Sequence, residues 1–138
     1  MGKLNFALIG AGRIGRVHAQ NLSWRIPEVN LLAVMDSSLE AAERCATDFQ
    51  IPSFGSDLNE ILDDRSLDAV VICSATPTHS NLIIKAAKAG KHIFCEKPIA
   101  LVLNQVDEAM SIVYEQSVKF QVGFNRRFDP SFHEAHEL

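Results

Sequence analysis

A Gly-x-Gly-x-x-Gly motif near the amino terminus constrains the fold of this chain more than any other feature. Its glycines, Gly10, Gly12 and Gly15, directly follow the apolar run Phe6–Ile9 and begin the segment Arg13–Leu22. A strand, a glycine turn and a helix in this order are the context in which the motif binds a dinucleotide. Gly10 permits a tight turn, Gly12 lets the backbone approach a pyrophosphate, and Gly15 lets the helix pack closely against the strand. The bare motif is also compatible with a glycine-rich turn that binds no ligand.

A second apolar run ends in a carboxylate at the distance that dinucleotide binding requires. The run Leu31–Met35 is followed by Asp36, about 20 residues after the last glycine, where an acid binds the ribose 2′-OH. Asp36 could instead cap the next helix, but Ser37 or Ser38 can do this equally well. We therefore predict a dinucleotide site. Because no Arg stands at position 37 or 38 to accept a 2′-phosphate, NAD is favoured over NADP.

Composition excludes several other classes of protein. The 138 residues fit one domain, and 47% hydrophobic and 22% charged residues are ordinary for a globular protein. A net charge of −4 without a basic block does not favour nucleic acid, and no apolar run is long enough to span a membrane. The first residues lack the apolar h-region of a signal peptide, so none is expected. Three cysteines, Cys45, Cys73 and Cys95, have no metal-like spacing, and we expect reduced core thiols in the cytoplasm.

Apolar runs and helical patterns alternate along the whole chain. This alternation predicts an α/β fold: a doubly wound (Rossmann) parallel sheet of about six strands with helices on both faces. The expected strands are Asn5–Ile9, Leu31–Asp36, Ile51–Phe54, Ala69–Cys73, His92–Cys95 and Lys119–Val122. The expected helices are Arg13–Ser23, Leu39–Phe49, Asp57–Leu62, His79–Ala89, Leu103–Gln116 and one that begins at Asp129-Pro130.

Four blocks in a fixed order carry a resemblance to a known family. They are Gly10–Gly15, Ala75–His79, Gly90–Pro98 with its Glu96-Lys97-Pro98, and Val122–Pro130. Together they resemble the glucose–fructose oxidoreductase / inositol dehydrogenase (Gfo/Idh/MocA) family, and the last block is most similar to the inositol 2-dehydrogenase branch. The resemblance covers essentially every residue and corresponds to the N-terminal NAD-binding domain only.

The resemblance implies a division of the chain and a missing part. Residues 1–123 would form the dinucleotide-binding domain, and residues 124–138 the crossover and the start of a truncated substrate domain. In the family, that second domain supplies much of the substrate pocket, together with an Asp and a His that take part in proton transfer. We do not assign this role to His133 or His136, which are expected to be exposed on a helix turn.

The resemblance also implies site residues. Lys97 would be catalytic and substrate-binding, because it would hold the substrate hydroxyl and help its deprotonation. Glu96 would face the cofactor and could pair with Lys97; the alternative is a surface salt bridge in a turn. Arg127 would contact substrate hydroxyls, with a charged hinge turn as the alternative. No metal site is expected. The expected cofactor-binding residues are Gly10, Gly12, Arg13, Ile14, Gly15, Asp36, Ser74, Ala75, Thr76, Pro77, His79, Glu96 and Arg126.

Some of these assignments have structural alternatives that the sequence leaves open. The loop Ser74–Pro77 could simply be a strand-to-helix turn in which Thr78 is the N-cap. His79 could have a structural role instead of touching the site. Arg13 could be an exposed residue of the first helical turn.

The function that the resemblance implies is NAD-dependent oxidation of a secondary hydroxyl of a cyclic polyol or sugar, such as myo-inositol. The alternative is a stand-alone NAD-binding module, or a truncated product, without turnover, and the 138 residues alone are expected to be inactive. The expected partner is a small polyol substrate, with no nucleic acid and no membrane. Because Phe124, Phe128 and Phe132 are expected to be exposed, we predict homo-oligomers.

Overall fold

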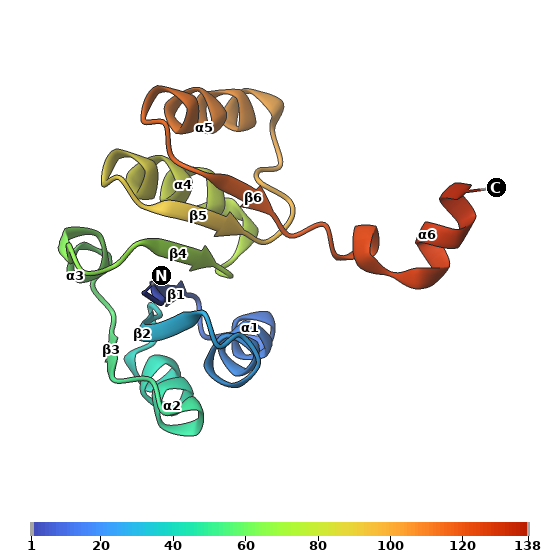
Figure 1. Cartoon of the computed structure of the whole chain (residues 1–138). Helices are drawn as coiled ribbons and strands as arrows, with labels where there is room; N and C mark the ends of the chain where they lie inside the picture. Colours follow the sequence, from blue (N-terminus) through green and yellow to red (C-terminus); the bar gives the residue numbers. More distant parts are fainter. Residues whose placement is uncertain (1, 138) are drawn as a thin grey trace.

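A computed structural model describes residues 2–137 and contains one six-stranded parallel sheet (Figure 1). The strand order is β3-β2-β1-β4-β5-β6, the order of the doubly wound dinucleotide-binding fold. The fold class predicted from the sequence is therefore confirmed. The strands are β1 (Leu4–Ile9), β2 (Val29–Met35), β3 (Ser53–Gly55), β4 (Ala69–Ile72), β5 (His92–Cys95) and β6 (Phe120–Val122).

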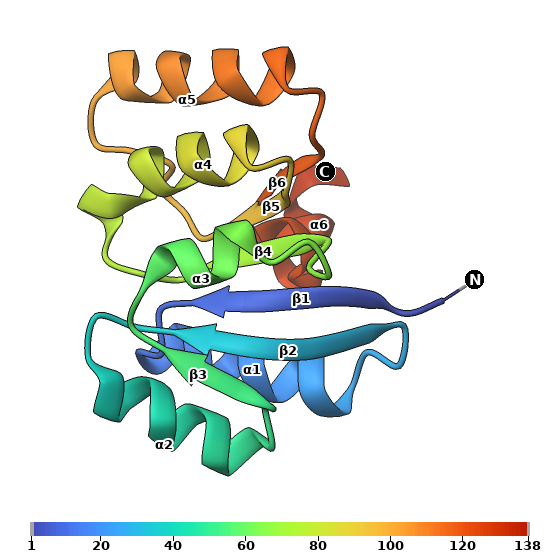
Figure 2. The ribbon, with the colours of Figure 1, turned by 90° about the vertical axis from the view of Figure 1, so that its left-hand side faces the viewer.

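Helices cover both faces of the sheet, because successive side chains of each strand point to opposite faces. On β1, Ala7 and Ile9 pack with the buried residues of α3, α4 and α5, whereas Leu8 packs with those of α1 and α2. In Figure 2, α4 and α5 lie beside the half of the sheet that contains β4, β5 and β6, and α1 and α2 lie beside the half that contains β1, β2 and β3. The helices are α1 (Arg13–Trp24), α2 (Leu39–Phe49), α3 (Leu58–Asp63), α4 (His79–Lys88), α5 (Leu103–Glu115) and α6 (Pro130–Glu137).

Element ends follow the local signals closely. Ser38 caps α2 by accepting from Ala41 N, and Asp57 caps α3 by accepting from Asn59 N. Gly90 follows α4 with a φ of +72°, as expected for a helix stop. The predicted ranges differ from the observed ones mainly at the edge strand, which lies at 53–55 instead of 51–54. It begins after Pro52, which has no N–H to donate to a ladder.

Two short 3₁₀ helices were not predicted. The first, η1 (Thr76–Thr78), leads into α4, and the second, η2 (Asn125–Phe128), lies between β6 and α6. Both occupy segments that the sequence analysis treated as turns, and a 3₁₀ helix is a common way to enter a regular helix.

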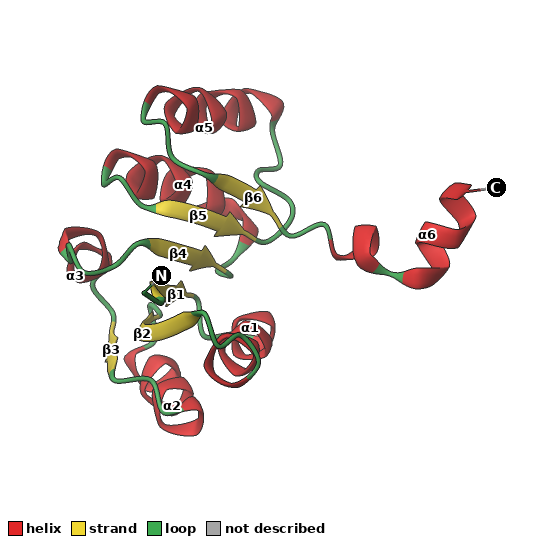
Figure 3. Cartoon of the chain, viewed as in Figure 1, coloured by secondary structure: helices red, strands yellow, loops and turns green. Residues whose placement is uncertain are grey.

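The C-terminal segment leads away from the sheet. After β6, η2 and α6 project to one side of the domain (Figures 1 and 3). Phe124, Phe128 and Phe132 are exposed by 56%, 74% and 52%. The expected exposure of these rings is confirmed.

No helix within residues 2–137 combines the length and the apolar character needed to cross a membrane.

Candidate dinucleotide site

The candidate site lies at the carboxyl edge of the sheet. Because all the strands are parallel, their carboxyl ends meet at one edge, and ligands bind there where the strand order reverses. In this sheet the reversal lies between β1 and β4. The residues that directly follow strand ends at this edge are Gly10 after β1, Asp36 after β2, Cys73 after β4, Glu96 after β5 and Gly123 after β6.

Gly10 makes the tight turn that leaves β1. Its φ is +102°, a value that L side chains rarely adopt, and its N–H donates to Met35 O at 2.8 Å. A Cβ at this position would lie 2.6 Å from the Cys73 carbonyl carbon and the Ser74 N. The turn therefore fits only a glycine, because the loops after β1 and β4 are in direct contact.

The other two glycines have different structural roles. A Cβ at Gly15 would lie 1.9 Å from Gly10 O, so α1 packs against the turn only because Gly15 has no side chain. A Cβ at Gly12 would meet nothing within 4 Å. Gly12 is the N-cap of α1, no side chain caps this helix, and its first turn has no acidic residue. The first N–H groups of α1 are therefore available to an anion such as a pyrophosphate.

Asp36 joins this turn to the end of β2. Its Oδ2 accepts from Ala11 N at 2.7 Å and its Oδ1 accepts from Ser38 N at 2.9 Å. The carboxylate is therefore fixed beside the glycine turn before any ligand arrives. An ionised carboxylate has about four lone-pair positions, so two backbone bonds leave capacity for ribose hydroxyls.

A cleft opens between these elements. Its volume is about 340 Å³, within the usual range for small-molecule pockets. Gly10, Asp36 and Ser37 line it from one side, and Ser74 and Ala75 from the other. The part of the cleft lined by Gly10, Asp36 and Ser37, over the β1 and β2 ends, is suited to the adenosine part of a dinucleotide.

The loop after β4 is held by its own hydroxyl groups. Ser74 Oγ lies 2.7 Å from Thr78 Oγ1, which donates to Ala75 O at 2.7 Å. Thr78 occupies the N-cap position of α4, but its side chain makes no capping bond there. The strand-to-helix turn therefore lies where the alternative interpretation placed it. The Thr78 hydroxyl, however, stabilises the loop and does not cap α4.

Glu96 is paired with a residue that the sequence analysis did not consider. Its Oε1 lies 2.8 Å from His18 Nε2 on α1, and its Oε2 accepts from the Lys97 backbone N at 3.3 Å. The ion pairs of the described residues do not include the Lys97 ammonium. The suggested Glu96–Lys97 ion pair is therefore replaced by a His18–Glu96 pair. Lys97 is exposed, and its bond to Pro98 is cis.

The sequence indicates only weakly that His18 has a polar partner. His18 precedes the buried Ala19 on α1, and its ring packs on Phe94 of β5 with a centroid distance of 5.1 Å. A polar ring next to the apolar face of a helix hints at a partner, but only the β5 contact identifies Glu96 as that partner.

Two buried thiols lie below this edge. Burial, and after it the negative charge of Glu96, raises the pKa of Cys95 to about 12 and raises the pKa of Cys73. Burial also raises the pKa of Cys45. Since the thiolate is the reactive form, these raised pKa values favour the unreactive thiol form of all three side chains.

The remaining predicted residues lie in three different surroundings. Arg13 and Ile14 are exposed on the first turn of α1. His79 is 1% exposed, with both ring nitrogens at backbone carbonyls, which favours its structural alternative. Arg126 and Arg127 lie on η2, where the Arg126 guanidinium contacts Asp129 and the Phe132 ring within the C-terminal segment.

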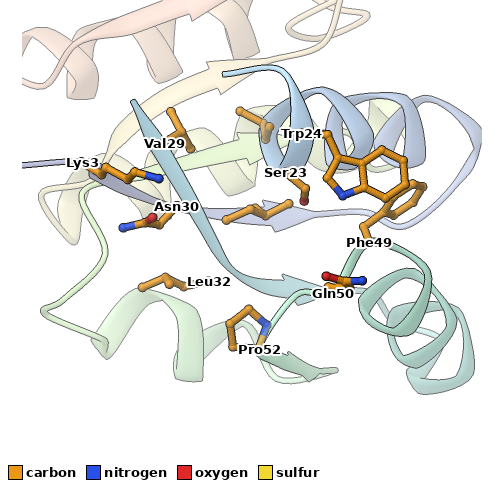
Figure 4. Close-up of a pocket in the computed structure, with 11 residues that line it drawn as sticks. Lys3, Ser23, Trp24, Val29, Asn30, Leu32, Phe49, Gln50 and Pro52 are labelled. Atoms are coloured by element: carbon orange, nitrogen blue, oxygen red, sulfur yellow. The ribbon is translucent and has the colours of Figure 1, made fainter. Parts of the chain in front are cut away.

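A second cleft lies away from this edge (Figure 4). It occupies about 260 Å³ beside the first half of β2, with Lys3 and Asn30 at one end and the Trp24 and Phe49 rings at the other. It brings together none of the predicted site residues.

The fold and the site define a class of protein. A doubly wound sheet, a glycine turn at the point of strand reversal and an acid after β2 form a dinucleotide-binding domain. A family model described as "Oxidoreductase family, NAD-binding Rossmann fold" matches residues 4–124. The chain belongs to this family.

Similar proteins include inositol dehydrogenases. The scyllo-inositol 2-dehydrogenase (NAD(+)) of Bacillus subtilis is 43% identical over 94% of this chain, and the inositol 2-dehydrogenase of Rhizobium meliloti is 46% identical over 94%. The solved scyllo-inositol dehydrogenase of Lactobacillus casei, with bound NAD(H) and scyllo-inositol, has a TM-score of 0.91 at 30% identity over 99% of this chain. The chain spans only 38% to 40% of the length of these proteins.

Proposed function

We propose that this chain is the NAD-binding part of a dehydrogenase that oxidises a secondary hydroxyl of a cyclic polyol, such as an inositol, to a ketone. The observation that carries the proposal is the meeting of the Gly10–Gly15 turn, Asp36 and the Glu96-Lys97-Pro98 turn at one sheet edge. The names of similar proteins support the choice of substrate class.

In this proposal, different residues bind the cofactor, bind the substrate and assist removal of its proton. Bound NAD would accept the hydride from the carbinol carbon. The N-terminus of α1 holds the pyrophosphate, and Asp36 holds the ribose of the adenosine. Lys97, at the end of β5, holds the substrate hydroxyl and assists removal of its proton. Arg127 is assigned to substrate hydroxyls and Arg126 to the cofactor.

The proposed cofactor is NAD and not NADP. A 2′-phosphate beside Asp36 would bring two negative charges together, and the next residues are Ser37 and Ser38, which offer no positive charge. We also propose the cytoplasm as the compartment, which the three unbridged buried thiols support.

NADH is expected to bind saturably to this chain, and Asp36→Ala is expected to weaken binding about tenfold or more. The variant loses the ribose acceptor and also the bond that fixes Ala11 N. Titration of NADH by fluorescence checks this, with Asp107→Ala, at an exposed position on α5 outside the cleft lining, as the matched control. Absence of binding by the unmodified chain would refute the proposed function. A preference for NADPH would refute the cofactor choice alone.

The chain is expected to self-associate through its exposed aromatic rings. Phe128 and Phe132 lie on the segment that projects from the domain, and pairing of the same patch on two copies would cover both. Sedimentation velocity over a concentration series should show a larger species that Phe128→Ser combined with Phe132→Ser removes. The exposed Tyr114→Ser on α5 is the control. A monomer at every concentration would contradict this expectation.

A further inference from the structure

His79 joins the two loops that follow β4 and β5. It is the first residue of α4, and it is 1% exposed. Its Nδ1 lies 2.8 Å from Pro98 O and its Nε2 lies 2.9 Å from Ser74 O. One side chain therefore contacts the loop that lines the candidate cleft and the turn that carries Lys97.

In these contacts the His79 ring can act only as a hydrogen-bond donor. A backbone carbonyl can accept a hydrogen bond but cannot donate one, so a ring nitrogen that bonds to it must carry hydrogen. The neutral ring has one N–H and can donate to one loop at a time, whereas the doubly protonated ring donates to both. No ring nitrogen is left to touch a ligand directly.

The turn around Lys97 is anchored on both sides. The residue before Lys97, Glu96, is held by His18 of α1 at 2.8 Å, and the residue after it, Pro98, is held by His79 of α4. The two helices lie on opposite faces of the sheet. Lys97 itself is exposed, so its backbone is fixed by the neighbouring residues while its side chain remains free to reach a ligand.

We propose that His79 is a positioning residue, which sets the Lys97-Pro98 turn against the Ser74 loop at the nicotinamide end of the cofactor site. The proposal rests on the proposed NAD-dependent function. Asp36 and the glycine turn define the adenosine and pyrophosphate end over β1 and β2, so the nicotinamide end lies over β4 and β5, across the point of strand reversal. The loss of the His79 bonds is therefore felt mainly by the nicotinamide half of the dinucleotide.

Two substitutions of similar shape separate this role from general stability. His79→Met removes both donors, whereas His79→Gln keeps an NH₂ group with two N–H donors. We expect His79→Met to weaken NADH binding about tenfold and His79→Gln to weaken it by less than about threefold. ADP, which lacks the nicotinamide half, should bind both variants within about twofold of the unmodified chain. Calorimetric titration of the 138-residue chain measures all of these affinities.

The possible results distinguish a failure of the proposed NAD-dependent function from a failure of the proposed role of His79. If the unmodified chain binds neither NADH nor ADP, the proposed function fails. If it binds both, and His79→Met weakens both equally or neither, His79 has only a structural role and the proposal is overturned. Equal losses of NADH binding in the Met and Gln variants would also overturn it, because the donors would then be irrelevant. Should His79→Met not fold, His79→Phe takes its place as the variant without donors.

Discussion

Gly15→Ala is expected to destabilise the chain by about 3 kcal/mol, whereas Gly12→Ala is expected to cost less than about 1 kcal/mol. The added Cβ at Gly15 would lie 1.9 Å from Gly10 O, a backbone atom that cannot move aside without shifting the turn. The Cβ at Gly12 would meet nothing within 4 Å, and φ there is −69°. The remaining cost at Gly12 is that of Ala in place of Gly at an N-cap. Urea unfolding measures both changes.

Gly12→Ala is expected to affect cofactor binding much more than it affects stability. The surface that is open at Gly12 is the surface that a pyrophosphate must approach, so Gly12→Ala should weaken NADH binding about tenfold or more while the protein stays folded. Gly2→Ala, whose Cβ would also meet nothing within 4 Å, is the control that should change neither quantity. Wild-type affinity in Gly12→Ala would show that no phosphate passes close to this residue.

No measurable oxidation of myo-inositol is expected when the 138 residues alone are supplied with NAD. The family resemblance implies that an Asp and a His for proton transfer belong to the second domain. General acid–base assistance is typically worth ~10² to 10⁴ in rate, and substrate positioning contributes further factors. Lys97 is exposed at the sheet edge, so a polyol would have only one wall to bind against. The loss of oxidation rate should therefore be larger than the loss of NADH affinity caused by any single substitution described above.

The assay for this expectation is formation of NADH followed by absorbance, with NADH binding measured on the same preparation to show that the site is folded. Lys97→Met is the matched variant. Robust turnover that disappears in Lys97→Met would contradict the expectation and would mean that Lys97 and its neighbours suffice for proton removal. Binding without turnover is the expected result, and it also matches the alternative of an NAD-binding module.

Much of the candidate site was predictable because its parts are local in sequence. The three glycines and the acid after β2 occur at spacings that a strand, a turn and a helix impose. Gly10 does adopt a positive φ, and Ser38 does cap α2, which leaves Asp36 Oδ2 to accept from Ala11 N of the glycine turn.

The partners of Glu96 and Lys91 were not predictable. Glu96 pairs with His18, which lies far from it in sequence. Lys91 is 5% exposed, and its ammonium donates to the backbone carbonyls of Asp64 and Leu67 in the loop between α3 and β4. Lysine is rarely buried unless it is paired, so composition alone assigns Lys91 to the surface. These contacts arise between strands and helices that the sheet brings together.

The sequence by itself determined the elements, their parallel order and the edge at which a dinucleotide would bind, because hydrophobic period, glycine position and capping residues act over a few neighbouring residues. Only the tertiary structure decided which side chains complete that edge. His18 reaches Glu96 across one face, and His79 joins Ser74 to Pro98 from the other. Such contacts depend on how helices pack against particular strands, and sequence spacing carries no record of that packing.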